Sequence, residues 1–514
     1  MKSGALIVAA VALVAYVQTV GFGFIYDDYW TVVGNEHLQK SFRTLVRGAL
    51  SGNTVRWGMP DATRPLMGIS LWLDRGLFGL SAAGHHLHSV LLYMLVSVLV
   101  FALGFALLRS FAGALAAGLA FAVAPLHSEV AAAINYREDL LAAIGVFGAA
   151  ALAFWPAREP LRSRPYLIAA LWLYALLGKE SAIIAPLLWA ALWLWRRPPR
   201  ATLQSTLPLA LGVVGVAWLN WRFGLSVLGE QIPRADYASW GERCLRTARF
   251  EVLSVVESLL PLRARPEFDP ALDASPAWLL GFALLLGVGV WFARGRRTRC
   301  FAALIAVALS APLASCPLVA PANELADRYW FLGSLAAALL VGYIVHVVSR
   351  KREPVAVLGL SLLVLAGVGA TWSAASVWES EVSLWTFAVS TAPNSPRAWS
   401  SLSRAHRMAG QEELAEKTVE RALERRPDYV PGRVARALNY LWAGHLTEAR
   451  TVLKAIDPKS QLHRDALRVA ARCAALHDAL EAQKCAQEAV PQGLVLGDPE
   501  QLRERSERLL AREP

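Results

Sequence analysis

Long apolar runs occupy the first three quarters of the chain and limit what it can fold into. A helix that crosses a bilayer needs about 20 predominantly apolar residues, and we count about eleven runs of this kind. They cover residues 4–22, 84–108, 111–124, 140–155, 166–177, 181–195, 207–223, 278–292, 300–318, 330–348 and 355–371. The chain is 55% hydrophobic and 18% charged, whereas soluble domains average about 25% charged residues. We therefore expect an all-α, polytopic membrane helical bundle. The first run is kept as a span because no small-residue cleavage site follows it.

The basic residues between the runs predict how the bundle is oriented. They form clusters at Arg109 and at residues 158–164, 196–200, 294–299 and 350–352. With eleven spans, every cluster lies on the same side as Lys2, which the positive-inside rule assigns to the cytoplasm. A further candidate at 246–262 carries Glu251 and Glu257 and would move the later clusters outward, so it is interpreted as an interfacial or re-entrant helix. The odd count predicts an extracytoplasmic C-terminal region.

The overall composition suggests in which membrane the protein lies and argues against one class of binding partner. The net charge is +11, but the basic residues form short clusters rather than one stripe, which argues against nucleic-acid binding. The bias toward Ala, Leu and Arg suggests a bacterial inner membrane, with the N-terminus cytoplasmic and the C-terminal region periplasmic.

The region after the last run has a different character, which predicts a membrane domain at 1–373 and a second domain at 374–514. Pairs of like residues recur there at a spacing of 34: Pro393 and Pro427, Gly410 and Gly444, Ala415 and Ala449. This is the tetratricopeptide (TPR) period, so we expect a short TPR-like α-solenoid of two or three repeats. Such arrays bind protein partners on a concave surface; a supporting stalk is the alternative.

Two of the five cysteines fall on neighbouring predicted helices of this second domain. These are Cys473 and Cys485. A disulfide between them fits an oxidising compartment, but the sequence alone leaves the pairing open.

Acidic residues collect on the outward side of the predicted bundle. In the first outward loop (residues 23–83), Asp27 and Asp28 are adjacent at a membrane boundary. Adjacent carboxylates that repel each other and lose hydration have raised pKa values, which suits one of them to act as a general base. The alternative is a solvated helix cap.

The second outward loop (residues 125–139) carries His127, Glu129, Arg137 and Asp139. A divalent metal such as Mg²⁺ or Mn²⁺ bound by His127, Glu129 and Asp139 is one interpretation. An ion pair between Arg137 and an acid is the other, and the sequence does not decide between them.

Cationic residues at outward span ends complete the pattern. Arg64 precedes the second run, Lys179 and Glu180 lie between two runs, and Arg328 and Tyr329 precede the tenth. A phosphate leaving group needs fixed cations, and the guanidinium fork binds two phosphate oxygens. Lys179 and Glu180 could instead neutralise each other.

Taken together, these segments resemble the GT-C superfamily of multi-span glycosyltransferases, and most closely the transmembrane-and-tetratricopeptide O-mannosyltransferase family and its bacterial relatives. The matching segments are Tyr26-Asp27-Asp28, Thr63-Arg64-Pro65-Leu66, Gly84-His85-His86-Leu87-His88, Pro125-Leu126-His127-Ser128-Glu129, Tyr136-Arg137-Glu138-Asp139-Leu140-Leu141-Ala142, Lys179-Glu180 and Asp327-Arg328-Tyr329. The chain departs from the family pattern at His88, Ser89 and Tyr136, where the family usually has Val, Asn and Gly.

The resemblance implies a GT-C-like enzyme that moves a sugar, with inversion, from a polyprenyl-phosphate donor in the membrane to a hydroxyl of a protein Ser/Thr or an envelope glycolipid. Three acids are then candidates for the catalytic centre: Asp27, Asp28 and Glu129. The donor phosphate would be bound by Arg64, Arg137, Lys179, Arg328 and Tyr329. The acceptor would be oriented by His127, Asp139 and Glu180. Relatives differ in metal dependence, so no metal is assigned.

Two other classes of function fit parts of the sequence. One is a non-enzymatic membrane and TPR scaffold for envelope or polysaccharide assembly. The other is a transporter, which predicts acids near mid-membrane and inverted repeats; here the acids lie at span ends. Neither sugar, acceptor nor lipid length follows from the sequence.

Overall fold

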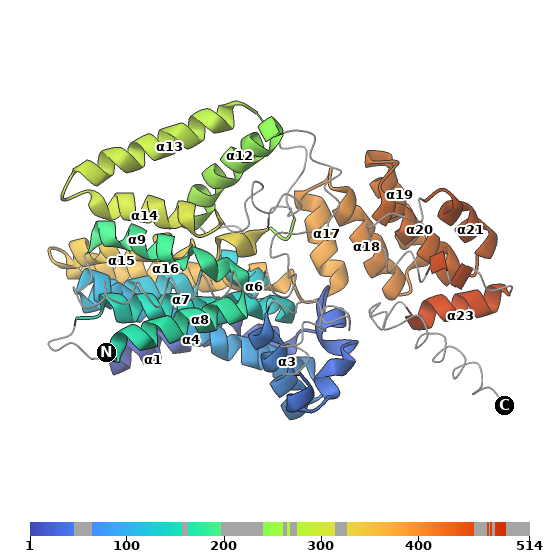
Figure 1. Cartoon of the computed structure of the whole chain (residues 1–514), viewed down its shortest axis with the longest axis horizontal. Helices are drawn as coiled ribbons and strands as arrows, with labels where there is room; N and C mark the ends of the chain where they lie inside the picture. The colour runs from blue at the N-terminus through green and yellow to red at the C-terminus, as the bar shows by residue number, and fades with distance from the viewer. Residues whose placement is uncertain are drawn as a thin grey trace.

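The computed structural model describes residues 1–45, 64–156, 163–196, 240–260, 265–267, 275–313, 326–456, 470–471, 473–474 and 478–489. All regular secondary structure within these ranges is helical. Figure 1 shows a bundle of long helices, with a smaller group of shorter helices, α17 to α23, beyond one end of it. The predicted run at 207–223 lies outside the described residues.

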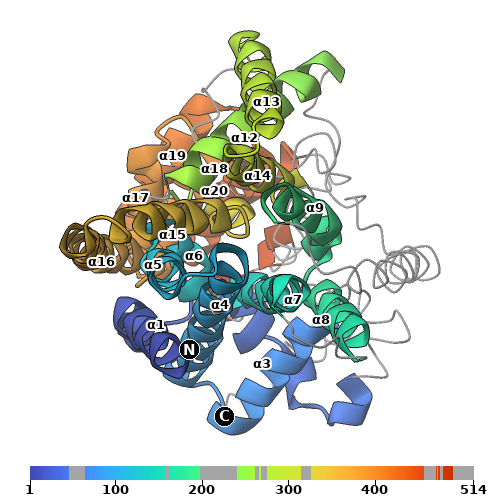
Figure 2. The same ribbon diagram turned by 90° about the vertical axis from the view of Figure 1, so that its left-hand side faces the viewer.

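Helix α4 (Ala82–Leu108) lies inside the bundle and organises its packing. It packs against α1 (Lys2–Tyr16), α5 (Phe111–Ala122) and α7 (Arg137–Phe154), as Figure 2 shows in a view along the helices. Helix α8 (Arg164–Gly178) packs on α7. These helices are apolar on several faces because they are enclosed by other helices on one side and by lipid on the other.

The later helices form the other side of the bundle. They are α9 (Ala185–Trp195), α12 (Trp240–Leu259), α13 (Ala277–Arg294), α14 (Arg299–Ser310), α15 (Leu335–Ser349) and α16 (Glu353–Ser376). Helices α5 and α15 approach closely through Gly113 and Gly342. A Cβ on Gly113 would lie 2.8 Å from the Gly342 carbonyl oxygen, so small residues are required where these backbones meet.

Fewer helices of the structure are long and apolar enough to be definite membrane spans than the sequence predicted. Among the described residues, four helices are long and apolar enough to cross a membrane: Lys2–Gly21, α4, α13 and α16. A fifth arises if α5 and the segment Pro125–Ala132, bent by 50°, are counted as one span. Four shorter apolar helices add to these. The chain therefore has the character of a multi-pass membrane protein, and the count of about eleven stays a prediction.

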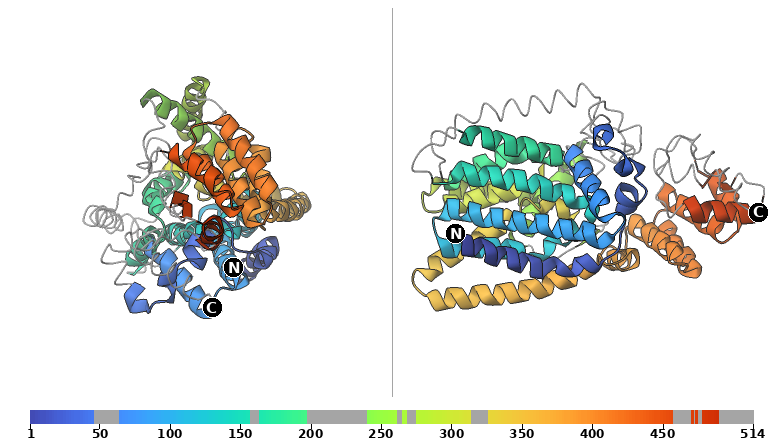
Figure 3. Two further views of the ribbon diagram at one scale, coloured as in Figure 1. Left: turned by 90° about the vertical axis from the view of Figure 1, so that its right-hand side faces the viewer. Right: turned by 90° about the horizontal axis from the view of Figure 1, so that it is seen from below.

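The two ends of the bundle differ, as the charge pattern predicted. The N-terminus and the turn between α13 and α14, which contains the basic cluster at 294–299, lie at one end. Helix α17 (Glu381–Thr391) lies at the other (Figures 1 and 3). Which compartment each end faces stays a prediction.

The C-terminal helices begin at the end of the bundle opposite the N-terminus. After α17 come α18 (Pro396–Met408), α19 (Glu412–Arg425), α20 (Val430–Trp442), α21 (Leu446–Lys454) and α23 (Ala479–Ala489). The turns after α18 and α20 contain Gly410 and Gly444, with φ of +72° and +79°, a conformation that favours glycine. Helices α18 and α20 pack against their successors and against each other. Their interpretation as a TPR-like solenoid stays a prediction. Cys473 and Cys485 form a disulfide in the structure, a pairing that the sequence left open.

Candidate functional site

Asp28 joins the two outward loops. Its side chain is fully buried, and its carboxylate accepts hydrogen bonds from the backbone N–H of Ile25 at 3.2 Å and of Asn135 at 2.7 Å. Burial raises the pKa of Asp28 to about 7, although both N–H donors act in the opposite direction. Because both oxygens are engaged, Asp28 is placed to position the loops rather than to react.

Asp27 is the more accessible carboxylate. Its side chain is half-buried, and its Oδ2 lies 3.5 Å from the Asn135 side-chain amide nitrogen. Burial raises the pKa of Asp27 to about 6, while the guanidinium groups of Arg328, Arg404 and Arg397 limit the rise. A carboxylate with this pKa is ionised at neutral pH and still basic enough to accept a proton.

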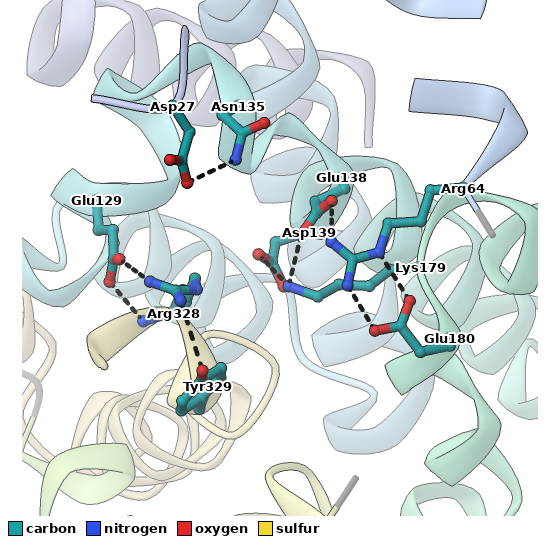
Figure 4. Close-up of polar contacts among 10 residues, drawn as sticks. All are labelled: Asp27, Arg64, Glu129, Asn135, Glu138, Asp139, Lys179, Glu180, Arg328 and Tyr329. Carbon is teal, nitrogen blue, oxygen red and sulfur yellow. Dashed lines mark hydrogen bonds and ion pairs between the residues drawn. The ribbon is translucent and has the colours of Figure 1, made fainter. Parts of the chain in front are cut away.

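Glu129 and Arg328 form an ion pair that connects the second outward loop to the segment before α15. Glu129 lies in the short helix α6 (Ser128–Ala132), and Arg328 lies in the 3₁₀ turn η10 (Asp327–Trp330). The Arg328 guanidinium is 2.5 Å from Glu129 Oε1, and its backbone N–H donates to Oε2 at 2.9 Å. Figure 4 shows this pair in the same region as Asp27.

Two aromatic rings fix the direction of the Arg328 guanidinium. Its central carbon lies 4.3 Å from the Tyr136 ring and 5.0 Å from the Tyr329 ring. Stacking on aromatic faces orients an arginine and keeps its charge. The side chain of Arg328 is 20% exposed, so the structure presents a fixed cation near Asp27.

A second group of charges lies beside the first. Arg64 binds both oxygens of Glu180 at 2.7 and 2.6 Å and also contacts Glu138. Lys179 lies 2.7 Å from Asp139 Oδ2 and 3.1 Å from Glu138 Oε1. Arg64 directly precedes α3 (Pro65–Phe78), and the other residues come from the start of α7 and from the α8–α9 connection. Figure 4 shows the cluster, in which each predicted cation contacts a predicted acid.

Arg137 is buried away from these groups. Its guanidinium is 2.5 Å from Asp74 Oδ2 and donates to Ser89, Ser70 and the His85 carbonyl oxygen at 3.0, 2.9 and 2.6 Å. The side chain has no exposed surface. The geometry therefore gives Arg137 a structural role as the partner of an acid, which is one of the two alternatives that the sequence left open. It does not place Arg137 to contact a donor phosphate.

Arg137→Ala is expected to lower stability without weakening donor binding. Removing one partner of a buried ion pair costs about 3–5 kcal/mol, and the substitution leaves the buried Asp74 carboxylate with His88 as its remaining partner at 2.5 Å. Thermal unfolding of the purified variant in detergent would show a lower midpoint, while the donor Kd of the folded fraction stays within about twofold of the wild-type value, since a twofold change is only about 0.4 kcal/mol. An unchanged midpoint combined with weaker donor binding would contradict the structural role.

His127 lies beneath the site rather than in it. Its ring nitrogens are 2.8 Å from the Tyr93 hydroxyl and 2.7 Å from the Ser334 hydroxyl, and the side chain is fully buried. Glu129 is paired with Arg328 and Asp139 with Lys179. The three residues considered for a metal thus do not converge, and in the described part of the chain no three His, Cys, Asp or Glu side chains are grouped to hold one.

Three residues reach the site from beyond the last apolar run, and the sequence did not predict them there. Glu381 on α17 and Arg397 and Arg404 on α18 contact Tyr26, the neighbour of Asp27. They had been assigned to a separate repeat domain. The signal that could have identified them is the combination of an acid and two arginines in the first helices after the last apolar run.

Comparison with known proteins gives partial matches. No protein-family model matches the chain, and no solved structure matches it significantly. The chain is 35% identical over 187 residues to protein O-mannosyl-transferase Tmtc1 of Drosophila melanogaster, covering 35% of this chain and 21% of that protein. It is 33% identical over 142 residues to Tmtc2 of the same species, covering 26% of this chain and 15% of that protein.

A longer match extends over most of the chain. A protein O-mannosyl-transferase of Caenorhabditis elegans is 23% identical over 446 residues, which are 82% of this chain and 63% of that protein. The chain thus spans less than two thirds of each of these relatives. Their names support the family that the outward-loop motifs resemble.

Proposed function

We propose that the chain is a GT-C type, inverting glycosyltransferase that transfers a hexose such as mannose from a polyprenyl-phosphate donor to an acceptor hydroxyl at the outer face of the membrane. The observation that carries this proposal is that a half-buried carboxylate with a raised pKa, Asp27, lies within electrostatic range of a guanidinium, Arg328, which Glu129 holds in place at one end of an apolar bundle. The names of the relatives support a glycosyltransferase role.

The proposed reaction needs a base on one side of the sugar and a cation on the other. Asp27 accepts the proton of the acceptor hydroxyl as that oxygen attacks the anomeric carbon. The bond between the anomeric carbon and the phosphate oxygen breaks, and the polyprenyl phosphate leaves with an additional negative charge. Arg328 stabilises this charge as it develops, which is where an enzyme lowers a barrier most effectively.

The remaining residues have supporting roles in this proposal. Asp28 and Asn135 position the loop that carries Asp27, and Glu129 fixes Arg328. Arg64, Lys179 and their acids form a neighbouring polar surface that would contact the donor headgroup or orient the acceptor, with Tyr329 beside Arg328. We derive no step through a metal ion. The acceptor is a protein Ser/Thr or an envelope glycolipid, and the C-terminal helices bind a protein partner.

A donor comparison tests the class of reaction. The protein in nanodiscs is incubated with either a Ser/Thr-containing peptide or an envelope glycolipid as acceptor. The donor is polyprenyl-phosphate mannose, polyprenyl-phosphate glucose or GDP-mannose. The proposal predicts a hexose mass shift of the peptide or of a glycolipid acceptor with a lipid-phosphate donor alone. Transfer from GDP-mannose, or no transfer to either acceptor class by a folded protein, would contradict it.

The pH dependence of transfer is expected to follow Asp27. Below a pKa of about 6 the carboxyl is protonated and cannot accept the acceptor proton, so kcat/KM falls about tenfold per pH unit on the acidic side. The donor is a phosphodiester and does not titrate in this range. Initial rates measured between pH 4.5 and 8 would show an acidic limb near pH 6; a flat profile over this interval would exclude Asp27 as the base.

A further inference from the structure

Glu381 connects the C-terminal helices to the turn that carries Asp27. Its carboxylate accepts the backbone N–H of Tyr26 and, at 3.0 Å, the indole N–H of Trp385. It also pairs with the Arg404 guanidinium at 2.9 and 3.1 Å. Glu381 is buried, so these three donors satisfy a charge that would otherwise be costly to remove from water.

Tyr26 adopts a backbone conformation that needs such support. Its φ is +48°, a left-handed conformation that costs an L-residue about 1–2 kcal/mol. The Tyr26 ring lies edge-on to Trp385 with 5.4 Å between centroids, and its hydroxyl accepts a hydrogen bond from Arg397 at 3.0 Å. Strained residues persist where surrounding contacts determine them, and they concentrate at functional sites.

An apolar cluster fixes the C-terminal helices on the outward loops beneath these polar contacts. The buried cluster joins Phe22, Ile25, Ala132, Ala133, Tyr136, Trp378, Leu384, Trp385, Ala398 and Leu402. Its members come from the end of the first apolar run, both outward loops, the turn between α16 and α17, and helices α17 and α18. The first helices of the predicted repeat domain are therefore packed into the site end of the bundle, not attached through a loose linker.

Charges from three directions act on Asp27. Arg328 belongs to η10, Arg397 and Arg404 to α18, and Glu381 to α17. The groups beside it on the outward loops are Asp28, Tyr26 and Tyr136. Arg404 favours the ionised carboxylate and Glu381 opposes it, so the two members of one ion pair have opposite effects on the same group.

We propose that Glu381 and Arg404, which lie beyond the last span, are positioning residues of the transfer site: together they hold the Tyr26–Asp27 turn in its strained conformation and adjust the charge of Asp27. This inference rests on the proposed function, in which Asp27 is the base. It predicts that the C-terminal helices are required for the chemical step as well as for partner binding.

The sign of a pH shift tests the proposal. Arg404→Ala removes a cation near Asp27, so the acidic limb of kcat/KM is expected to move to higher pH by about half a unit, a loss of about threefold at pH 5.5. Glu381→Gln keeps an acceptor for the Tyr26 N–H but removes a negative charge, so the limb moves to lower pH by about the same amount. Shifts in the same direction, or none in either variant, would overturn the proposal.

Matched variants separate positioning from folding and from the proposed function. Arg404→Lys keeps the charge, so the acidic limb of kcat/KM should stay at the wild-type pH. Arg421 is an exposed residue of α19, and Arg421→Ala should leave both the limb and the rate unchanged. If Arg404→Ala does not fold, Arg404→Gln provides the same test with a longer side chain. Asp27→Asn is measured in parallel. If it retains transfer, Asp27 is not the base and the proposed function fails. If it loses transfer but the acidic limbs of the Arg404 and Glu381 variants do not move, only the positioning roles fail.

Discussion

Asp27→Asn is expected to abolish sugar transfer while the protein folds normally. Asparagine has the same shape and can still contact Asn135, but its amide cannot accept a proton. Removing a general base costs about 10²–10⁴ in rate. Transfer is measured as the hexose mass shift of the acceptor, with the thermal unfolding midpoint recorded for the same preparation.

An exposed aspartate provides the control for this substitution. Asp428 lies in the turn after α19, and its side chain is 75% exposed. Asp428→Asn should transfer at the wild-type rate. If Asp27→Asn retained transfer within about threefold, a difference of less than 1 kcal/mol in barrier height, Asp27 would not be the base, and the proposed mechanism would need another proton acceptor.

Arg328→Ala has the second largest expected effect. The substitution removes the fixed cation and leaves the buried Glu129 carboxylate without its partner, so a negative charge replaces a neutral pair where the phosphate charge develops. Loss of a preorganised electrostatic contact costs about 10²–10³ in kcat. Donor affinity should fall as well, because in the proposed mechanism the same guanidinium also binds the phosphodiester before reaction.

Two further variants separate the effect of losing the Arg328 charge from a general effect on folding. Arg425→Ala removes a partly exposed arginine of α19 that stacks on Trp399 at 4.9 Å; its kcat and donor Kd should not change. Arg328→Lys should recover part of the rate, since it restores the charge but not the planar fork. Equal effects of Arg328→Ala and Arg425→Ala would refute the phosphate-binding role.

The sequence predicted the helical class and the grouping of Asp27, Glu129 and Arg328 because both follow from periodicity and order. Apolar runs mark helices, and charged residues at alternate run ends must meet at one end of a bundle. Asp27 in the first loop and Arg328, about 300 positions later, are close enough in the structure to interact electrostatically.

Other parts could not be predicted because they depend on side-chain direction. Arg137 follows Tyr136, whose ring stacks on Arg328, yet Arg137 points the other way and pairs with Asp74, 63 positions earlier. Nothing in the local sequence favours that partner over Glu129. His127 is similar: two residues from Glu129, it is directed inward to Tyr93 and Ser334.

The contribution of α17 and α18 was missed for a different reason. A change in composition after residue 373 predicts a domain boundary, but it does not say whether the two parts pack together. The buried residues that decide this, such as Trp378, Trp385 and Leu402, are equally compatible with an independent repeat core. The contacts of Glu381 and Arg397 with Tyr26 show that residues on both sides of the predicted domain boundary contribute to the candidate site.

The most direct test is to follow both products of the reaction at once. The purified full-length protein is given polyprenyl-phosphate mannose labelled in the sugar and, separately, in the lipid, together with the acceptor. The account predicts that one polyprenyl phosphate is released for each glycoside formed, and that Asp27→Asn stops both. Release of lipid phosphate without glycoside, or equal release by the wild type and Asp27→Asn, would contradict a transfer centre built on Asp27 and Arg328.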